Sequence, residues 1–174
     1  DNVLRQTTAR LPWLLIGMLG GIGNSMILGN FGTTFAAHPE MALYIPLIGG
    51  TGGNVGTQSS ALVVQGLANS SLDTKDTFKQ ILKETVVASI NATIISLLVY
   101  LYNFIRFGAT ATVTYSVSIS LFAVVMFASI FGTFVPMTLE KLKIDPAIAT
   151  GPFISITNDI IGMMLYMGIT VLLS

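Results

Sequence analysis

Five long segments of this sequence are nearly free of charge, and the charged residues stand between them. Charged residues make up only 9% of the 174 residues, against roughly 25% in an average soluble domain. A helix needs about 20 apolar residues to cross the ~30 Å hydrocarbon core of a bilayer. The pattern therefore predicts a single-domain, all-α integral membrane protein with five transmembrane helices, at approximately residues 11–31, 41–68, 85–107, 113–139 and 147–173.

The basic residues are distributed unequally between the two sides of this expected bundle. Arg106 is the one basic residue on the side of the loops that join the first segment to the second and the third to the fourth. The opposite side carries Arg5, Arg10, Lys75, Lys79, Lys83, Lys141 and Lys143. Cytoplasmic ends of membrane helices carry an excess of lysine and arginine. We therefore expect the N-terminus in the cytoplasm, the C-terminus outside, and the protein in the cytoplasmic membrane.

Residues 73–83, between the second and third segments, indicate a short cytoplasmic surface helix. Asp73 or Thr74 would cap its N-terminus. Its lysines recur every four residues, and a basic stripe beside apolar side chains suits an anionic lipid surface. A solvated loop helix explains the same pattern. Membrane lipids are expected partners of the chain in either case.

Asp159 is the only acidic residue inside one of the apolar segments, and residues 157–174 around it contain no lysine or arginine. An unpaired carboxylate at the depth of a bilayer costs roughly 2.5–3.5 kcal/mol on insertion scales, so it usually faces a bundle interior, a water-filled path or an ion. This favours a cation site. The alternative is a structural carboxylate that is hydrogen-bonded to polar side chains of neighbouring helices.

Small and polar residues recur every three or four positions along the fifth segment, which places them on one face of a helix. Asp145 and Pro146 supply a cap and a first helical position for this segment. The dipeptide at 151–152 is a potential kink. The small and polar face carries Gly151, Ser155, Asn158, Asp159, Gly162 and Tyr166.

The second segment contains two pairs of glycines four residues apart, in the run GGTGGNVG at 49–56. Such pairs allow a neighbouring helix to approach closely. Asn54 and Thr57 add an amide and a hydroxyl beside them. The alternative is that the glycines serve tight helix packing without any ligand.

The composition argues against enzymes and nucleic-acid binders. Without cysteine there is no thiol nucleophile and no thiolate metal site. A serine hydrolase needs a base, yet the single histidine, His38, lies in an external loop. An aspartyl protease needs two carboxylates that share a proton, and only one lies at depth. The net charge is zero and no basic run with interleaved aromatics exists, so no nucleic-acid partner is expected.

Two motifs carry a resemblance to a known family. PLIGGTGGNVGTQSSALVVQGLA at 46–68 and DPAIATGPFISITNDIIGMMLY at 145–166 are similar to the membrane domain of the MgtE-type magnesium channels and transporters. The resemblance covers essentially the whole chain. It implies a homodimer with a pore on the two-fold axis, lined by the second and fifth helices, in which Asp159 holds Mg²⁺. It also implies a cytoplasmic magnesium-sensing region ahead of the first helix, so we expect this chain to be a piece of a longer protein.

The chemistry of the residues agrees with that implication. Two Asp159 side chains across a dimer axis would match the charge of one divalent cation. Mg²⁺ dehydrates reluctantly and is usually held by one or two carboxylates and several waters. The expected transported ion is Mg²⁺, with Mn²⁺, Co²⁺ or Ca²⁺ able to substitute. The expected partners of its hydration shell are Gly151, Ser155, Asn158, Asn54 and Thr57.

The expected function is therefore passage of Mg²⁺ into the cell down its electrochemical gradient. Glu84, at the cytoplasmic edge of the third segment, is expected to be interfacial or, alternatively, to attract cations at a cytoplasmic pore mouth. Two other functions remain open at this point: a Na⁺- or H⁺-coupled divalent cation exchanger, and a membrane anchor whose polar stripe only packs helices.

Overall fold

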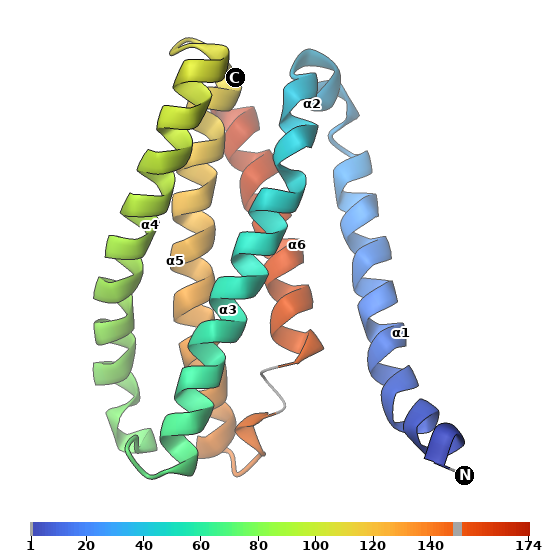
Figure 1. The fold of residues 1–174 in the computed structure, drawn as a ribbon, viewed down its shortest axis with the longest axis vertical. Coiled ribbons are helices and arrows are strands. Elements are labelled where there is room, and N and C mark those ends of the chain that lie inside the picture. The colour runs from blue at the N-terminus through green and yellow to red at the C-terminus, as the bar shows by residue number, and fades with distance from the viewer. Residues whose placement is uncertain (1, 148–150) are drawn as a thin grey trace.

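The computed structural model describes residues 2–147 and 151–174. Long helices run alternately up and down between two ends of the molecule, with short helical turns in the connections (Figure 1). The elements are α1 (Asn2–Gly29), α2 (Gly32–Ala37), η1 (Pro39–Tyr44), α3 (Ile45–Ala68), η2 (Thr74–Asp76), α4 (Thr77–Phe107), α5 (Thr112–Lys141) and α6 (Pro152–Leu173).

Glycine and proline set several of the helix boundaries. Gly108 ends α4 with a φ of 88°, a left-handed conformation that glycine adopts without a steric cost. Proline occupies the first turn of both α3 and α6. It fits there because its missing N–H would have no helical partner in any case.

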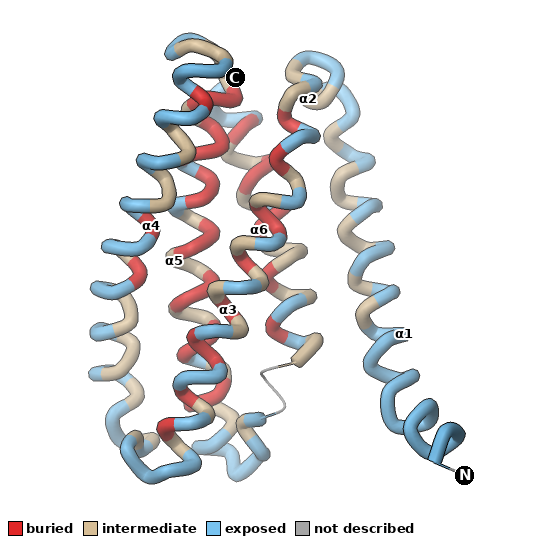
Figure 2. Tube along the Cα trace, viewed as in Figure 1, coloured by how far each residue is buried: buried red, intermediate tan, exposed pale blue. Residues whose placement is uncertain are grey.

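Helix α5 lies at the centre of the bundle. It packs against α3, α4 and α6, and buried residues run along most of its length (Figure 2). One apolar cluster joins it to η1, α3 and α6 near the α2 end of the molecule. In that cluster the Tyr166 hydroxyl donates a hydrogen bond to the Met41 carbonyl oxygen at 2.9 Å. The cluster therefore links α6 to the connection ahead of α3.

Helix α1 stands apart from this bundle. Its principal contact is with α6, and none of its residues is buried (Figure 2). The contact depends on Gly20, because a Cβ atom at that position would overlap the side chain of Ile156. Glycine thus allows α1 to lie against α6, and Leu28 near the end of α1 packs against the apolar cluster, while most of the α1 surface is exposed.

Among the described residues, four helical stretches are long and apolar enough to cross a membrane: α1, Thr74–Phe107, α5 and α6. Helix α3 falls short of that standard because of its glycines and polar residues, although it lies alongside α5 and α6. The all-helical fold expected from the sequence is confirmed. The expected count of five transmembrane helices is not, because α3 does not qualify on composition.

Two expectations about helix boundaries need correction. Residues 73–83 do not form a separate surface helix: Thr74–Asp76 is a single 3-10 turn, and α4 then continues without a break from Thr77. The cause is that the residues after Thr77 contain no glycine or proline to interrupt the helix. The helix expected over 147–173 starts at Pro152, so Gly151 and Pro152 form its beginning rather than a kink. Residues 148–150 of that expectation lie outside the described residues.

Candidate cation site

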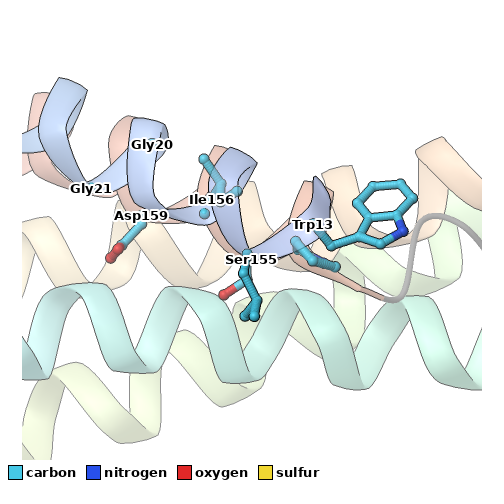
Figure 3. Close-up of a pocket in the computed structure, with 9 residues that line it drawn as sticks. Trp13, Gly20, Gly21, Ser155, Ile156 and Asp159 are labelled. Carbon is cyan, nitrogen blue, oxygen red and sulfur yellow. The ribbon is translucent and has the colours of Figure 1, made fainter. Parts of the chain in front are cut away.

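Asp159 faces a pocket of about 410 Å³ between α1 and α6. Ser155 lies one turn earlier on α6 and lines the same pocket. Figure 3 shows the labelled Asp159 and Ser155 in the space between α1 and α3. The sequence expectation that these two residues share one face of a helix is therefore correct.

Glycines of α3 make room for these side chains. A Cβ atom at Gly49 would overlap the Oδ1 atom of Asp159, and a Cβ atom at Gly53 would lie 3.6 Å from the Ser155 Oγ atom. The glycine pair four residues apart thus presents bare backbone to the polar face of α6. The close helix approach expected from the sequence is found, and the neighbouring helix is α6 of the same chain.

The Asp159 carboxylate has no partner among the described residues. Throughout residues 2–147 and 151–174, no side chain or backbone group donates a hydrogen bond to it, and no lysine or arginine pairs with it. A structural carboxylate held by polar side chains of neighbouring helices, the alternative that the sequence left open, would show such bonds. The carboxylate is instead half-buried and turned to the pocket.

Asn158 does not join this site. Its side chain is 1% exposed and points to the bundle interior, where a Cβ atom at Gly56 would overlap the amide nitrogen. Neither Oδ1 nor Nδ2 of Asn158 has a hydrogen-bond partner among the described residues. Adjacent helical residues point about 100° apart, so the polar stripe divides here: Asp159 faces the pocket and Asn158 faces the core.

The remaining expected partners lie apart from the pocket. Gly151 caps α6 just before the first lining residue of that helix, Pro152. Asn54 is exposed on α3. The Thr57 hydroxyl donates to the backbone carbonyl oxygens of Gly53 at 2.9 Å and of Asn54 at 3.1 Å, so it is already occupied within its own helix. None of these side chains lines the pocket of Asp159.

Glu84 lies elsewhere in the molecule. Its Oε1 atom accepts a hydrogen bond from the Ser59 hydroxyl at 3.0 Å, in a groove between α3, α4 and α5. Asp159 contacts α3 at Gly49, ten residues from Ser59, which corresponds to roughly 15 Å along the helix at ~1.5 Å per residue. The structure therefore does not bring Glu84 and Asp159 together.

Helix α1 supplies part of the pocket that the sequence reasoning did not assign. Trp13, Leu14, Gly17, Gly20 and Gly21 line it from that side. The signal was present in the small residues of GMLGGIG at 17–23, which are spaced for close helix contact. None of the α1 residues that line the pocket is charged, so this face carries no electrostatic signal in the sequence.

Comparisons with known proteins agree on one family. The family described as MgtE, divalent cation transporter, matches residues 45–169. The chain is 34% identical over 160 residues to the magnesium transporter MgtE of Bacillus subtilis (strain 168), covering 92% of this chain and 35% of that protein. It is 33% identical over 165 residues to the magnesium transporter MgtE of Thermus thermophilus, covering 95% of this chain and 36% of that protein. The chain thus spans about a third of the length of these curated relatives.

Proposed function

Because the chain belongs to the MgtE family of divalent cation transporters, we propose that it passes Mg²⁺ across the cytoplasmic membrane at a site built on Asp159. The protein is an integral membrane protein, with apolar helices of sufficient length. The basic N-terminal segment and the basic connections before α4 and α6 lie at one end of the molecule, and the proposal places that end in the cytoplasm (Figure 1).

The observation that carries the proposal is the carboxylate of Asp159, which faces a pocket and has no partner among the described residues. A carboxylate in a membrane helix is costly unless an ion or water compensates it. Ser155 adds a hydroxyl to the same pocket. We therefore assign the charge to Asp159 and a hydration-shell contact to Ser155, and we give no such role to Asn158, Asn54 or Thr57.

A second copy of the chain would complete the site. One carboxylate leaves a divalent ion with a net positive charge, whereas two Asp159 side chains around a common axis neutralise it. The unpartnered surfaces of α1 and of the exposed side of α3 flank the pocket and offer faces for such a copy. A homodimer with its pore on the two-fold axis is therefore part of the proposal.

The ion would be held with most of its water. Mg²⁺ prefers oxygen ligands in near-ideal octahedral geometry and usually keeps several waters. A pocket with one carboxylate and one hydroxyl from each copy suits such a hydrated ion. An inside-negative potential supplies about 4.6 kcal/mol per divalent ion at 100 mV, from ~2.3 per charge, so passive entry needs no coupled ion.

The test is Mg²⁺ influx into proteoliposomes loaded with a magnesium-sensitive dye. We expect Asp159→Asn, which keeps the size of the side chain and removes its charge, to reduce influx to below about a tenth of wild type. The protein should still elute from a sizing column at the position of the wild type.

The matched control is Asp76→Asn, the same chemical change at an exposed carboxylate at the end of η2. It should leave influx unchanged. Undiminished influx through Asp159→Asn would contradict the site. Mg²⁺ influx that requires an opposing Na⁺ or proton gradient would contradict passive passage and favour an exchanger.

A further inference from the structure

A second polar groove lies on the other side of α3, between α3, α4 and α5. It has a volume of about 540 Å³ and shares no lining residue with the pocket of Asp159. Glu84 is the acidic residue among its lining side chains, and no basic residue lines it. Its polar lining consists of Gln58, Ser59, Glu84, Asn91 and Ser129.

Glu84 is poorly compensated at this position. It lies at the N-terminal edge of the apolar part of α4, directly after Lys83, and is half-buried against α3. Its one hydrogen bond within the described chain comes from the Ser59 hydroxyl, which is itself only 7% exposed, and no described lysine or arginine forms an ion pair with it. A single neutral donor does not balance the full negative charge of a half-buried carboxylate. The carboxylate is therefore available to a cation in the groove.

Other polar side chains of the groove also lack partners. Ser129 is 3% exposed and lines the groove, yet its hydroxyl makes no hydrogen bond with any described residue. Gln58 and Asn91, at the edge of the groove, make none either. Buried polar groups are nearly always hydrogen-bonded, to protein, to water or to a bound ion. The unpaired Ser129 therefore points to a bound species in the groove.

We propose that this groove binds a monovalent metal cation such as Na⁺, with the Glu84 carboxylate as its charged ligand and the oxygens of Ser59 and Gln58 beside it. One positive charge neutralises one carboxylate, whereas a divalent ion would leave a net charge in the groove. Asn91 lies seven residues beyond Glu84 on α4, roughly 10 Å away along the helix. It is too far to share the ion with Glu84 and holds water of the groove instead.

The ion acts as a fixed structural element. Its ligands come from α3 and α4, and Ser129 of α5 closes the groove, so a bound cation holds these three helices together. Helix α3 also carries Gly49 and Gly53, which contact the polar face of α6. Occupancy of the groove would thereby stabilise the helix against which Asp159 rests, while the transported ion binds elsewhere.

The test is the thermal unfolding of the purified protein without Mg²⁺, in NaCl, in KCl and in N-methylglucamine chloride at equal ionic strength. A ligand that binds only the folded state raises the unfolding temperature. We expect Na⁺ or K⁺ to raise the unfolding temperature of the wild type by at least about 2 °C over N-methylglucamine. Glu84→Gln should abolish this shift, because its side chain keeps the shape and loses the charge.

Two control variants separate this site from other causes. Glu140→Gln makes the same change at a carboxylate outside the groove, and Asp159→Asn removes the carboxylate of the other site. Both should retain the full shift. A shift that is absent from the wild type, or that persists in Glu84→Gln, overturns the proposal.

Two further measurements keep the proposal testable if Glu84→Gln does not fold. ²²Na⁺ should bind more weakly to Ser59→Ala than to the wild type, because the substitution removes a neighbouring oxygen and leaves the carboxylate in place. Unchanged binding overturns the proposal.

The second measurement is thermal unfolding of Asp159→Asn in MgCl₂ at the same ionic strength, which should give no shift in unfolding temperature beyond that of N-methylglucamine chloride. A shift produced by Mg²⁺ and not by Na⁺ or K⁺ overturns the monovalent assignment, as does stabilisation by low pH alone.

Discussion

The carboxylate of Asp159 on α6 lies against the backbone of Gly49 on α3, with no space between them for a methyl group. The position of the charge is therefore set by a residue that has no side chain of its own. Contact between a carboxylate and bare backbone fixes its location without neutralising it. The site thus keeps its charge available to an ion.

Gly49→Ala should displace that carboxylate and lower Mg²⁺ influx by about tenfold or more, because an oxygen that supports a hydrated ion must keep its place within about an ångström. The substitution leaves Asp159 itself unchanged. The measurement is influx into proteoliposomes together with the sizing profile of the protein. Gly23→Ala is the control, since a Cβ atom at Gly23 would meet nothing within 4 Å; equal influx in both variants would show that the contact does not matter.

Asn158→Leu should raise the free energy of unfolding by about 1 kcal/mol, because it removes two buried polar atoms that have no partner among the described residues and keeps the branched shape of the side chain. Asn158→Asp, which adds a charge at the same place, should lower the stability. Chemical unfolding in mixed micelles measures both. Loss of Mg²⁺ influx in Asn158→Leu with unchanged stability would instead assign Asn158 to the ion path.

Tyr166→Phe should lower the free energy of unfolding by about 1–3 kcal/mol, because the Met41 carbonyl oxygen would remain buried without its donor. The matched control is Tyr115→Phe, whose hydroxyl makes a longer bond of 3.5 Å to the Leu173 carbonyl oxygen in an exposed position. Tyr115→Phe should lower the free energy of unfolding by less than half as much as Tyr166→Phe. Equal losses for the two variants would mean that the hydrogen bond to Met41 carries no special weight.

The helices themselves could be predicted from the sequence, since their apolar length is a local property. The expected segment at 113–139 corresponds to α5 at Thr112–Lys141, and the expected segment at 85–107 ends where α4 ends. The early start of α4 was missed because charged residues near a helix end mark the membrane surface and not the end of the helix. Hydropathy indicates whether a part of a helix lies in lipid or in water, whereas backbone hydrogen bonds determine how far the helix extends.

The candidate site could be predicted only in part. The spacing along α6 correctly joined Asp159 to Ser155, but a spacing of three or four cannot decide on which side of the stripe a given residue falls. That is why Asn158, one position before Asp159, was assigned to the ion and lies in the core instead. The pairing of Ser59 with Glu84 depends on packing between residues 25 positions apart, and no local pattern reports it.

The isolation of α1 has a further consequence. This helix forms one wall of the pocket around Asp159, yet it contributes no buried residue to the packed bundle. If α1 shifted sideways along the surface of α6, the opening of the pocket beside the Asp159 carboxylate would widen or narrow. The packing between α3, α5 and α6 would stay the same. Access to the charge therefore depends on where α1 lies against α6, a position set in part by the close contact of Gly20 with Ile156.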